Sequence, residues 1–156
     1  MAGTLSVNLH SAYVLFDTGA TFSCVAESFV AVCGLCAESM CGTLSVSTPL
    51  GSRRMLNLIC RDVNIEIGGS HLPTDLVVLD MVDFDVILGV DWLYRYKAVI
   101  DCHSQTVELK LPEGDVIIYK MEDQRPPTLP SYELWGKSSM LIAAMVVEEE
   151  LVVKLA

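Results

Sequence analysis

The chain has 156 residues, which suits one domain followed by a tail. Its hydrophobic content of 52% is enough for a core, but no apolar run reaches the roughly 18–20 residues that a membrane span requires. The 20 acidic and 10 basic residues give a net charge of −10, which argues against direct nucleic-acid binding; without a signal-peptide pattern, we expect a cytoplasmic protein with no membrane partner.

The first two predicted strands form a hairpin. Residues 3–9 partly alternate between apolar and polar side chains, which is typical of a half-buried strand. We expect His10 and Ser11 to turn the chain, and residues 12–16 to return as a buried strand. Asp17 follows this strand directly, and a carboxylate there is costly unless hydrogen bonds or a function hold it.

The next segments predict a short helix and a second hairpin. Residues 22–32 are apolar and suit a strand, a short helix or both in succession, and we expect a helix over 26–32 that Gly34 ends. Residues 44–48 and 55–60 are predicted strands joined by a polar tip. Arg53 and Arg54, just past this tip, are expected in solvent. On this pattern alone, an ordinary surface hairpin remains an alternative to a functional one.

The second half of the chain continues the strand pattern. Strands are expected over residues 62–67, 72–79, 84–88, 98–101, 106–111 and 116–119. Asp91 precedes a short apolar and aromatic segment and is expected to cap a helix there. Residues 125–131 are rich in proline and predict a linker, and residues 138–156 are a tail compatible with a helix. We therefore divide the chain into a domain over residues 1–121 and a linker with tail over 122–156.

Two motifs carry a resemblance to a known family. The segment Phe16-Asp17-Thr18-Gly19-Ala20 resembles the active-site loop of retroviral-type aspartic proteases, the retropepsins. The segment 87–93 and the following residues 98–102 are similar to proteases of gypsy-class LTR retrotransposons. The resemblance covers roughly residues 3–120. It implies an all-β, retropepsin-like acid protease barrel with one short helix after its second half, then the Pro-rich linker and tail.

The resemblance also implies an activity and a site. The chain has a single Asp-Thr-Gly, so it would act as a homodimeric aspartic endopeptidase, in which two Asp17 carboxylates hold a water, and would process a retroelement polyprotein. Thr18 would hydrogen-bond across the twofold axis, Gly19 would allow close approach, and Ala20 would border the substrate cleft. The implied flap is Pro49, Leu50, Gly51 and Ser52, and the implied support of the loop is Ile87, Leu88 and Gly89.

Two other readings of the chain remain open at this point. The same fold could be catalytically inactive and serve as a dimerisation or peptide-binding module. A small zinc-binding β protein is the other, because Cys33 and Cys36 form a Cys-x-x-Cys pair with Cys41 nearby. The sequence contains no second pair, and its three histidines are scattered, so we expect reduced thiols, no metal site and no cofactor.

Overall fold

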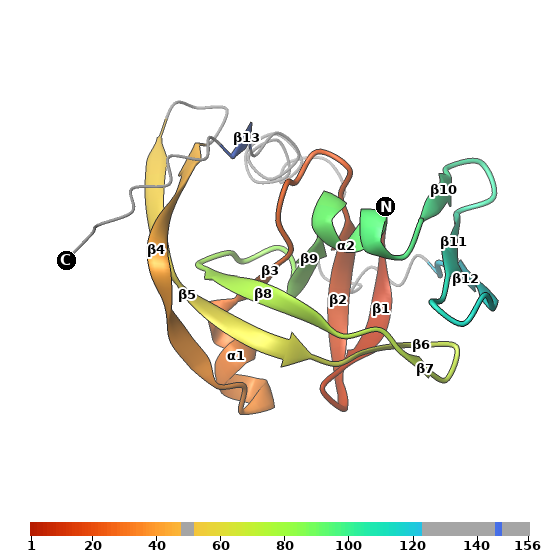
Figure 1. The fold of residues 1–156 in the computed structure, drawn as a ribbon, viewed down its shortest axis with the longest axis horizontal. Coiled ribbons are helices and arrows are strands. Elements are labelled where there is room, and N and C mark those ends of the chain that lie inside the picture. Colours follow the sequence, from red (N-terminus) through yellow and green to blue (C-terminus); the bar gives the residue numbers. More distant parts are fainter. Residues whose placement is uncertain (48–51, 123–145, 148–156) are drawn as a thin grey trace, which may run out of the picture.

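The computed structural model describes residues 1–47, 52–122 and 146–147, and the fold is mostly β (Figure 1). The strands are β1 (Ala2–Val7), β2 (His10–Phe16), β3 (Cys24–Ala26), β4 (Ala37–Ser47), β5 (Arg53–Val63), β6 (Ile65–Ile67), β7 (Ser70–His71), β8 (Thr74–Leu79), β9 (Val86–Leu88), β10 (Val99–Asp101), β11 (Thr106–Lys110), β12 (Val116–Lys120) and β13 (Val146–Val147). The helices are α1 (Glu27–Cys33) and α2 (Val90–Arg95). The all-β prediction is confirmed.

The strands form two sheets. The larger one has ten strands in the order β13-β4-β5-β8-β3-β9-β2-β1-β6-β7, and the smaller one has the order β10-β11-β12. Among the described strands, no pairing joins β13 to β7, so the ten-stranded order is linear. In Figure 1 the β4–β5 hairpin stands at one side, and the small sheet lies at the other side, beyond β1 and β2.

The first hairpin turns earlier than the sequence predicted. β1 and β2 pair antiparallel up to Val7 and His10, so the turn is Asn8-Leu9 and not His10-Ser11. Both turn residues have positive φ, 48° and 69°, as a two-residue hairpin of type I′ requires. Leucine rarely adopts this conformation, so nothing in its residue type indicated the turn.

Four neighbouring strands of the large sheet, in the order β8-β3-β9-β2, bring distant parts of the chain together. β2 pairs parallel with β9, with Phe16 opposite Leu88. β3 lies between β9 and β8, and Cys24 is opposite both Ile87 and Val77. β3 and β9 are each flanked on both sides, and all of their residues are apolar and buried. The loops that follow β2 and β9 therefore leave the sheet side by side.

The apolar segment after this loop is a strand and a helix in succession. β3 leads directly into α1, which ends where Gly34 adopts φ 61° and its N–H bonds to the Val30 carbonyl. A glycine in this left-handed conformation is a common end to a helix. The expected helix over residues 26–32 is confirmed, shifted by one residue.

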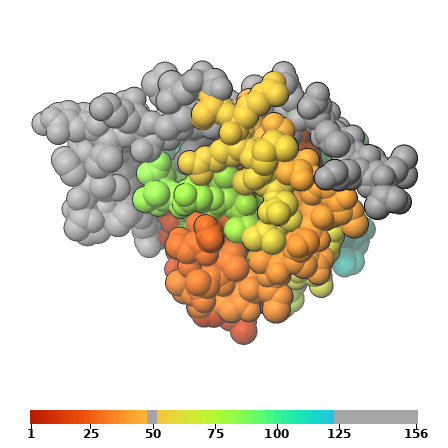
Figure 2. Space-filling model, turned by 90° about the vertical axis from the view of Figure 1, so that its left-hand side faces the viewer, coloured from red at the N-terminus to blue at the C-terminus, as the bar shows by residue number. Residues whose placement is uncertain are grey.

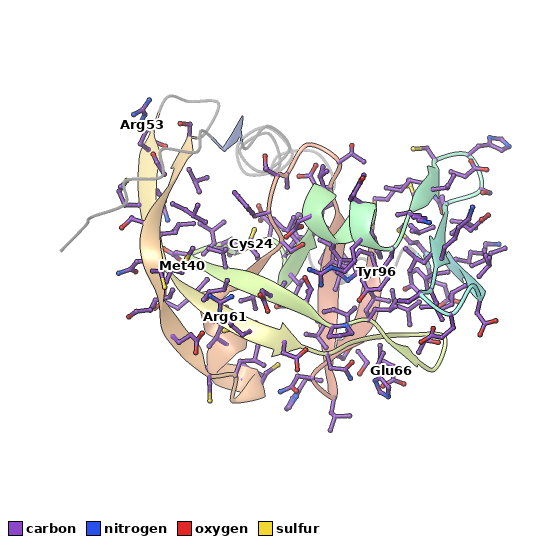
Figure 3. The ribbon with its side chains drawn as sticks, in the orientation of Figure 1. Cys24, Met40, Arg53, Arg61, Glu66 and Tyr96 are labelled. Carbon is purple, nitrogen blue, oxygen red and sulfur yellow. The ribbon has the colours of Figure 1, made fainter. Side chains whose placement is uncertain are left out.

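The β4–β5 hairpin is longer than the sequence predicted (Figure 2, orange and yellow). Its predicted tip residues Pro49, Leu50 and Gly51 lie outside the described residues, whereas Ser52 is described and directly precedes β5. Arg53 and Arg54 are exposed at the start of β5, as expected, and Figure 3 shows Arg53 at that far end of the hairpin.

The predicted strand over residues 62–67 is broken in two. Asp62 has φ 52°, and its N–H donates to the carboxylate of Asp75 at 2.8 Å. β5 runs through Asp62 with an irregularity in its pairing to β8 and ends at Val63, and β6 starts at Ile65 in a different part of the sheet, where it pairs with β1. Val63, Ile65 and Ile67, which alternate with polar residues in the sequence, are all buried.

The end of the chain is described at one point only. Val146 and Val147 form β13 and pair antiparallel with Ser47 and Val46, so a helix does not cover these two residues. The remainder of the predicted tail and the Pro-rich segment 125–131 lie outside the described residues, and the division at residue 122 stays a prediction. In the described ranges, no helix has the length and apolarity to cross a membrane.

Candidate active site

The turn after β2 folds around its own acid. The Asp17 N–H donates to the Leu88 carbonyl at 3.0 Å, which continues the β2–β9 pairing by one residue. The Gly19 N–H donates to Asp17 Oδ1 at 2.8 Å, and the Ala20 N–H reaches the Asp17 carbonyl at 3.3 Å. Three backbone hydrogen bonds thus hold Asp17 at the end of a buried strand.

The second oxygen of this carboxylate, Oδ2, differs from Oδ1 in its hydrogen bonding. Asp17 Oδ2 is buried and, within the described ranges, accepts no hydrogen bond. A buried polar atom without a partner costs about 1–3 kcal/mol, and more when it is charged, so proteins rarely keep one without a function. Oδ2 is therefore the oxygen that the protein's own donors leave available for chemistry.

Gly89 lies directly beneath the Asp17 loop, next to Ile87 and Leu88, which are fully buried in β9. A Cβ atom on Gly89 would lie 2.6 Å from the Ala20 carbonyl oxygen and 2.8 Å from the carbonyl carbon and oxygen of Phe22. The Val90 N–H donates to that same Ala20 carbonyl at 2.8 Å. The absence of a side chain at residue 89 is what lets the two loops touch.

Ser23 and Asp91 join the far end of the loop to α2. The Asp91 carboxylate accepts hydrogen bonds from the Ser23 N–H (3.1 Å), the Ser23 hydroxyl (2.7 Å) and the Trp92 N–H (2.8 Å). The Ser23 hydroxyl oxygen also accepts from the Gly89 N–H at 3.0 Å. The Ser23 hydroxyl therefore both donates and accepts a hydrogen bond inside the fold.

This arrangement corrects the expected role of Asp91. The N-cap of α2 is Gly89, and Asp91 lies in the first turn of the helix, where its carboxylate faces Ser23. Ser23 was not among the site residues predicted from the sequence, and its side chain is completely buried.

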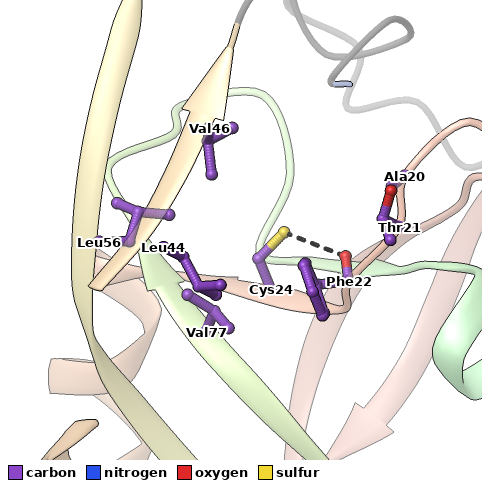
Figure 4. Close-up of a pocket in the computed structure, with 8 residues that line it drawn as sticks. All are labelled: Ala20, Thr21, Phe22, Cys24, Leu44, Val46, Leu56 and Val77. Carbon is purple, nitrogen blue, oxygen red and sulfur yellow. Dashed lines mark hydrogen bonds between the residues drawn. The ribbon is translucent and has the colours of Figure 1, made fainter. Parts of the chain in front are cut away.

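An apolar pocket lies between the Asp17 loop and the β4–β5 hairpin (Figure 4). The loop side contributes Ala20, Thr21, Phe22 and Cys24, and the opposite side contributes Leu44, Val46, Leu56 and Val77. Burial raises the pKa of the Cys24 thiol to about 12, and the nearby carboxylates of Asp91 and Asp17 add to this effect. Cys24 therefore lines the pocket as a neutral, largely apolar side chain; Figure 3 shows it in the interior.

The structure brings some of the predicted site residues together around Asp17, whereas most of the predicted flap lies outside the described residues. Residues 87–89 lie against the loop that carries Asp17. Thr18 and Gly19 are exposed on the loop, and Ala20 is buried at the pocket wall. Of the predicted flap, only Ser52 is described.

The cysteines offer no metal site in the described part of the chain. All six lie in that part as free thiols, of which Cys24, Cys33 and Cys60 are buried. No group of three or more His, Cys, Asp or Glu residues there is arranged to hold an ion. The Cys-x-x-Cys pair is not completed by further ligands, so nothing here supports the zinc-binding alternative.

Comparison with protein families matches residues 1–115 to the model for retroviral aspartyl protease. Among curated proteins, the chain is 26% identical over 129 residues to the UBA domain-containing protein Mud1 of Schizosaccharomyces pombe, covering 83% of this chain and 38% of that protein. It is 28% identical over 103 residues to DNA damage-inducible protein 1 of Yarrowia lipolytica, covering 66% and 26%. The chain thus spans well under half the length of these relatives.

Two solved structures are similar in fold. The retroviral protease-like domain of Ddi1 from Leishmania major superimposes with a TM-score of 0.58 at 16% identity, over 79% of this chain and 96% of that one. The EIAV protease, in complex with the inhibitor HBY-793, gives a TM-score of 0.51 at 22% identity, over 65% and 91%. At these identities the likeness concerns the fold alone.

Proposed function

The chain belongs to the retroviral aspartyl protease family, and we propose that it is an aspartic endopeptidase that acts as a homodimer. One observation carries the proposal: in the Asp-Thr-Gly loop, Asp17 Oδ1 accepts a hydrogen bond from the Gly19 N–H, and Asp17 Oδ2 is buried without a partner among the described residues. A carboxylate that is positioned but half unsatisfied suits a group that handles a water and its protons.

We propose a homodimer because the reaction needs two carboxyl groups at the site and the chain has a single Asp-Thr-Gly loop. Acid–base hydrolysis of a peptide bond by this chemistry needs two carboxyl groups that share one proton. The two aspartates that flank β9 are already committed, since Asp85 accepts from the Tyr13 N–H at 2.8 Å and Asp91 is bound by Ser23 and Trp92. A twofold axis beside the loop would instead place Asp17 against its own copy. Thr18 and Gly19, exposed on the loop, would lie at this contact.

The proposed reaction uses the pair as base and acid. One Asp17 carboxylate takes a proton from the water as its oxygen attacks the peptide carbonyl carbon, while the protonated partner gives its proton to the carbonyl oxygen. The tetrahedral intermediate then loses the amine, which leaves with a proton from the first carboxyl group. One hydroxyl group of the intermediate returns its proton to the partner carboxylate and becomes the carbonyl group of the acid product, which restores the shared proton of the pair. The apolar residues beside the loop, among them Ala20 and Val46, would contact an apolar side chain of the peptide.

We further propose a retroelement polyprotein as the substrate. The support is the sequence of the second motif, residues 87–93 and 98–102, which resembles gypsy-class proteases. Neither Mud1 nor DNA damage-inducible protein 1 is named as a retroelement protein. The chain covers only 38% and 26% of their lengths, so we do not transfer the activities of these whole proteins to it.

The test is Asp17→Asn. This change keeps the shape of the side chain but removes the group that takes and gives the proton, so peptide cleavage at mildly acidic pH should fall by about 10²–10⁴-fold or more. Circular dichroism should show an unchanged fold, and sedimentation equilibrium should show a dimer for both proteins. The exposed Asp83→Asn should cleave normally. Wild-type protein that dimerises without cleaving any peptide would support the non-catalytic module instead.

A further inference from the structure

The β4 strand has one edge that the hairpin does not use. On one side β4 pairs with β5 along the hairpin, with Val46 opposite Arg54 and Ser47 opposite Arg53. On its other side, the same two residues pair with β13, Val46 with Val147 and Ser47 with Val146 (Figure 1). A segment a hundred residues further along the chain thus occupies this edge as an added antiparallel strand.

This edge borders the candidate active site. Val46 and Leu44 of β4 line the same apolar pocket as Ala20 and Thr21, which follow Asp17 within the loop (Figure 4). An extended segment paired with Val46 is therefore bound to a residue that lines this pocket. This neighbourhood suits a peptide that binds beside the Asp17 loop.

The chemistry of such an edge favours an extended peptide. Unpaired N–H and C=O groups of an edge strand bind a further strand through main-chain hydrogen bonds, and pockets beside it select side chains. Valine is among the residues most enriched in strands. Val146 and Val147 follow the apolar residues 141–145 and precede three glutamates, so the segment is a short apolar peptide with an acidic end.

We propose that the segment around Val146–Val147 is an intramolecular ligand of the candidate active site, bound in cis at the β4 edge where a peptide substrate would bind. Bound there, it lowers the affinity of the site for other peptides. The part of this inference that concerns substrate rests on the proposed function; the pairing of the segment with β4 does not.

The first test measures the pairing without using catalysis. In the full chain carrying Asp17→Asn, Val146 and Val147 are both changed to proline, which has no N–H and cannot pair within a sheet. The matched control changes Val152 and Val153, the other Val-Val pair of the tail, to proline. Because successive N–H groups of a strand point to opposite neighbours, one of the Val46 and Ser47 amides faces β13 and the other faces β5. Hydrogen exchange of the amide that faces β13 should rise by about tenfold in the first variant and stay unchanged in the control. Equal exchange in both variants would overturn the proposal.

The second test measures competition at the site. A fluorescein-labelled peptide with the sequence of residues 141–150 is titrated into the same two variants and followed by anisotropy. It should bind the Val146→Pro/Val147→Pro chain at least about tenfold more tightly than the control, because no internal segment competes. Equal affinity for both would contradict the inference.

Dilution separates binding in cis from binding by a second copy. The exchange rate at Val46 and Ser47 should not change with protein concentration, and a marked rise on dilution would overturn the intramolecular arrangement. The two proposals also fail differently. If the wild-type chain cleaves peptides but the Val146→Pro/Val147→Pro change alters neither exchange nor peptide affinity, only this inference is overturned. If that change has the expected effects but the wild-type chain never cleaves a peptide, only the proposed endopeptidase activity is overturned.

Discussion

The Asp91 carboxylate binds both the backbone N–H and the hydroxyl of Ser23, a residue 68 positions earlier in the chain. It also accepts the Trp92 N–H, so two carboxylate oxygens serve three donors at 2.7–3.1 Å. A carboxylate suits this place because it only accepts hydrogen bonds. The contact fastens the end of the Asp17 loop to the first turn of α2, and we infer that it keeps the loop in position.

Asp91→Asn should therefore weaken the fold at this point. An asparagine of the same shape has one accepting oxygen and an amide group that donates, so at least one of the Ser23 and Trp92 donors loses its partner. We expect the free energy of unfolding, measured with urea, to fall by about 1–3 kcal/mol. The matched control is Asp83→Asn on the exposed loop before β9, which should change stability by less than about 0.5 kcal/mol. Equal stability of the two variants would show that the Ser23 contact contributes little.

Gly89→Ala adds only one methyl group but should displace the loop that carries Asp17. The added methyl group would lie 2.6 Å from the Ala20 carbonyl oxygen and 2.8 Å from backbone atoms of Phe22, so the loop must move. Overpacking of this kind costs about 1–3 kcal/mol, and peptide cleavage should fall with the displaced Asp17. Gly42→Ala in β4 is the control, because its methyl group would meet nothing within 4 Å. Full cleavage activity in Gly89→Ala would contradict the assigned support role.

The six thiols should react in two groups. Burial raises the pKa of Cys24, Cys33 and Cys60 above the ordinary value of 9.0, and it also blocks access to reagents. At pH 8, a colorimetric disulfide reagent should titrate three thiols quickly in the native protein, and the remaining three only after unfolding in urea. The fast group is Cys36, Cys41 and Cys102. Rapid reaction of all six without urea would show that the described packing is wrong.

Cys24 should make the fold less stable in alkaline solution. Its pKa is raised from 9.0 to about 12, so between these values the unfolded chain loses the thiol proton while the folded chain keeps it. The associated stability is fully present below pH 9 and is lost as the pH rises towards 12, at about 1 kcal/mol per pH unit. Urea unfolding at pH 8, 9 and 10 should show a smaller loss for Cys24→Val than for wild type. Identical slopes would argue against a buried neutral thiol.

Local patterns in the sequence predicted most elements of this fold correctly. Alternation identified the buried residues on each side of Asn64, and the apolar segment 84–88 contained the central strand β9. The errors occurred where a tertiary contact set the backbone. Asp62 has a positive φ with its N–H bound to Asp75, at an irregularity of the β5–β8 pairing, and β5 ends one residue later at Val63. Asp91 resembled a helix cap because its distant partner, Ser23, could not be identified from the sequence.

The candidate site could be predicted from the sequence only in part. The buried strand and the carboxylate directly after it could be identified from their own residues, because strand burial depends on neighbours in the chain. The roles of the Asp-Thr-Gly loop and of Gly89 were implied by the resemblance to retropepsins. Only the tertiary structure brought Gly89 against the Ala20 carbonyl, closed the Ser23–Asp91 contact and left Asp17 Oδ2 unsatisfied within the described residues. It also paired Val146–Val147 with the edge of β4. These contacts join segments 66 to about 100 residues apart, and their geometry depends on how the strands are ordered in the sheet.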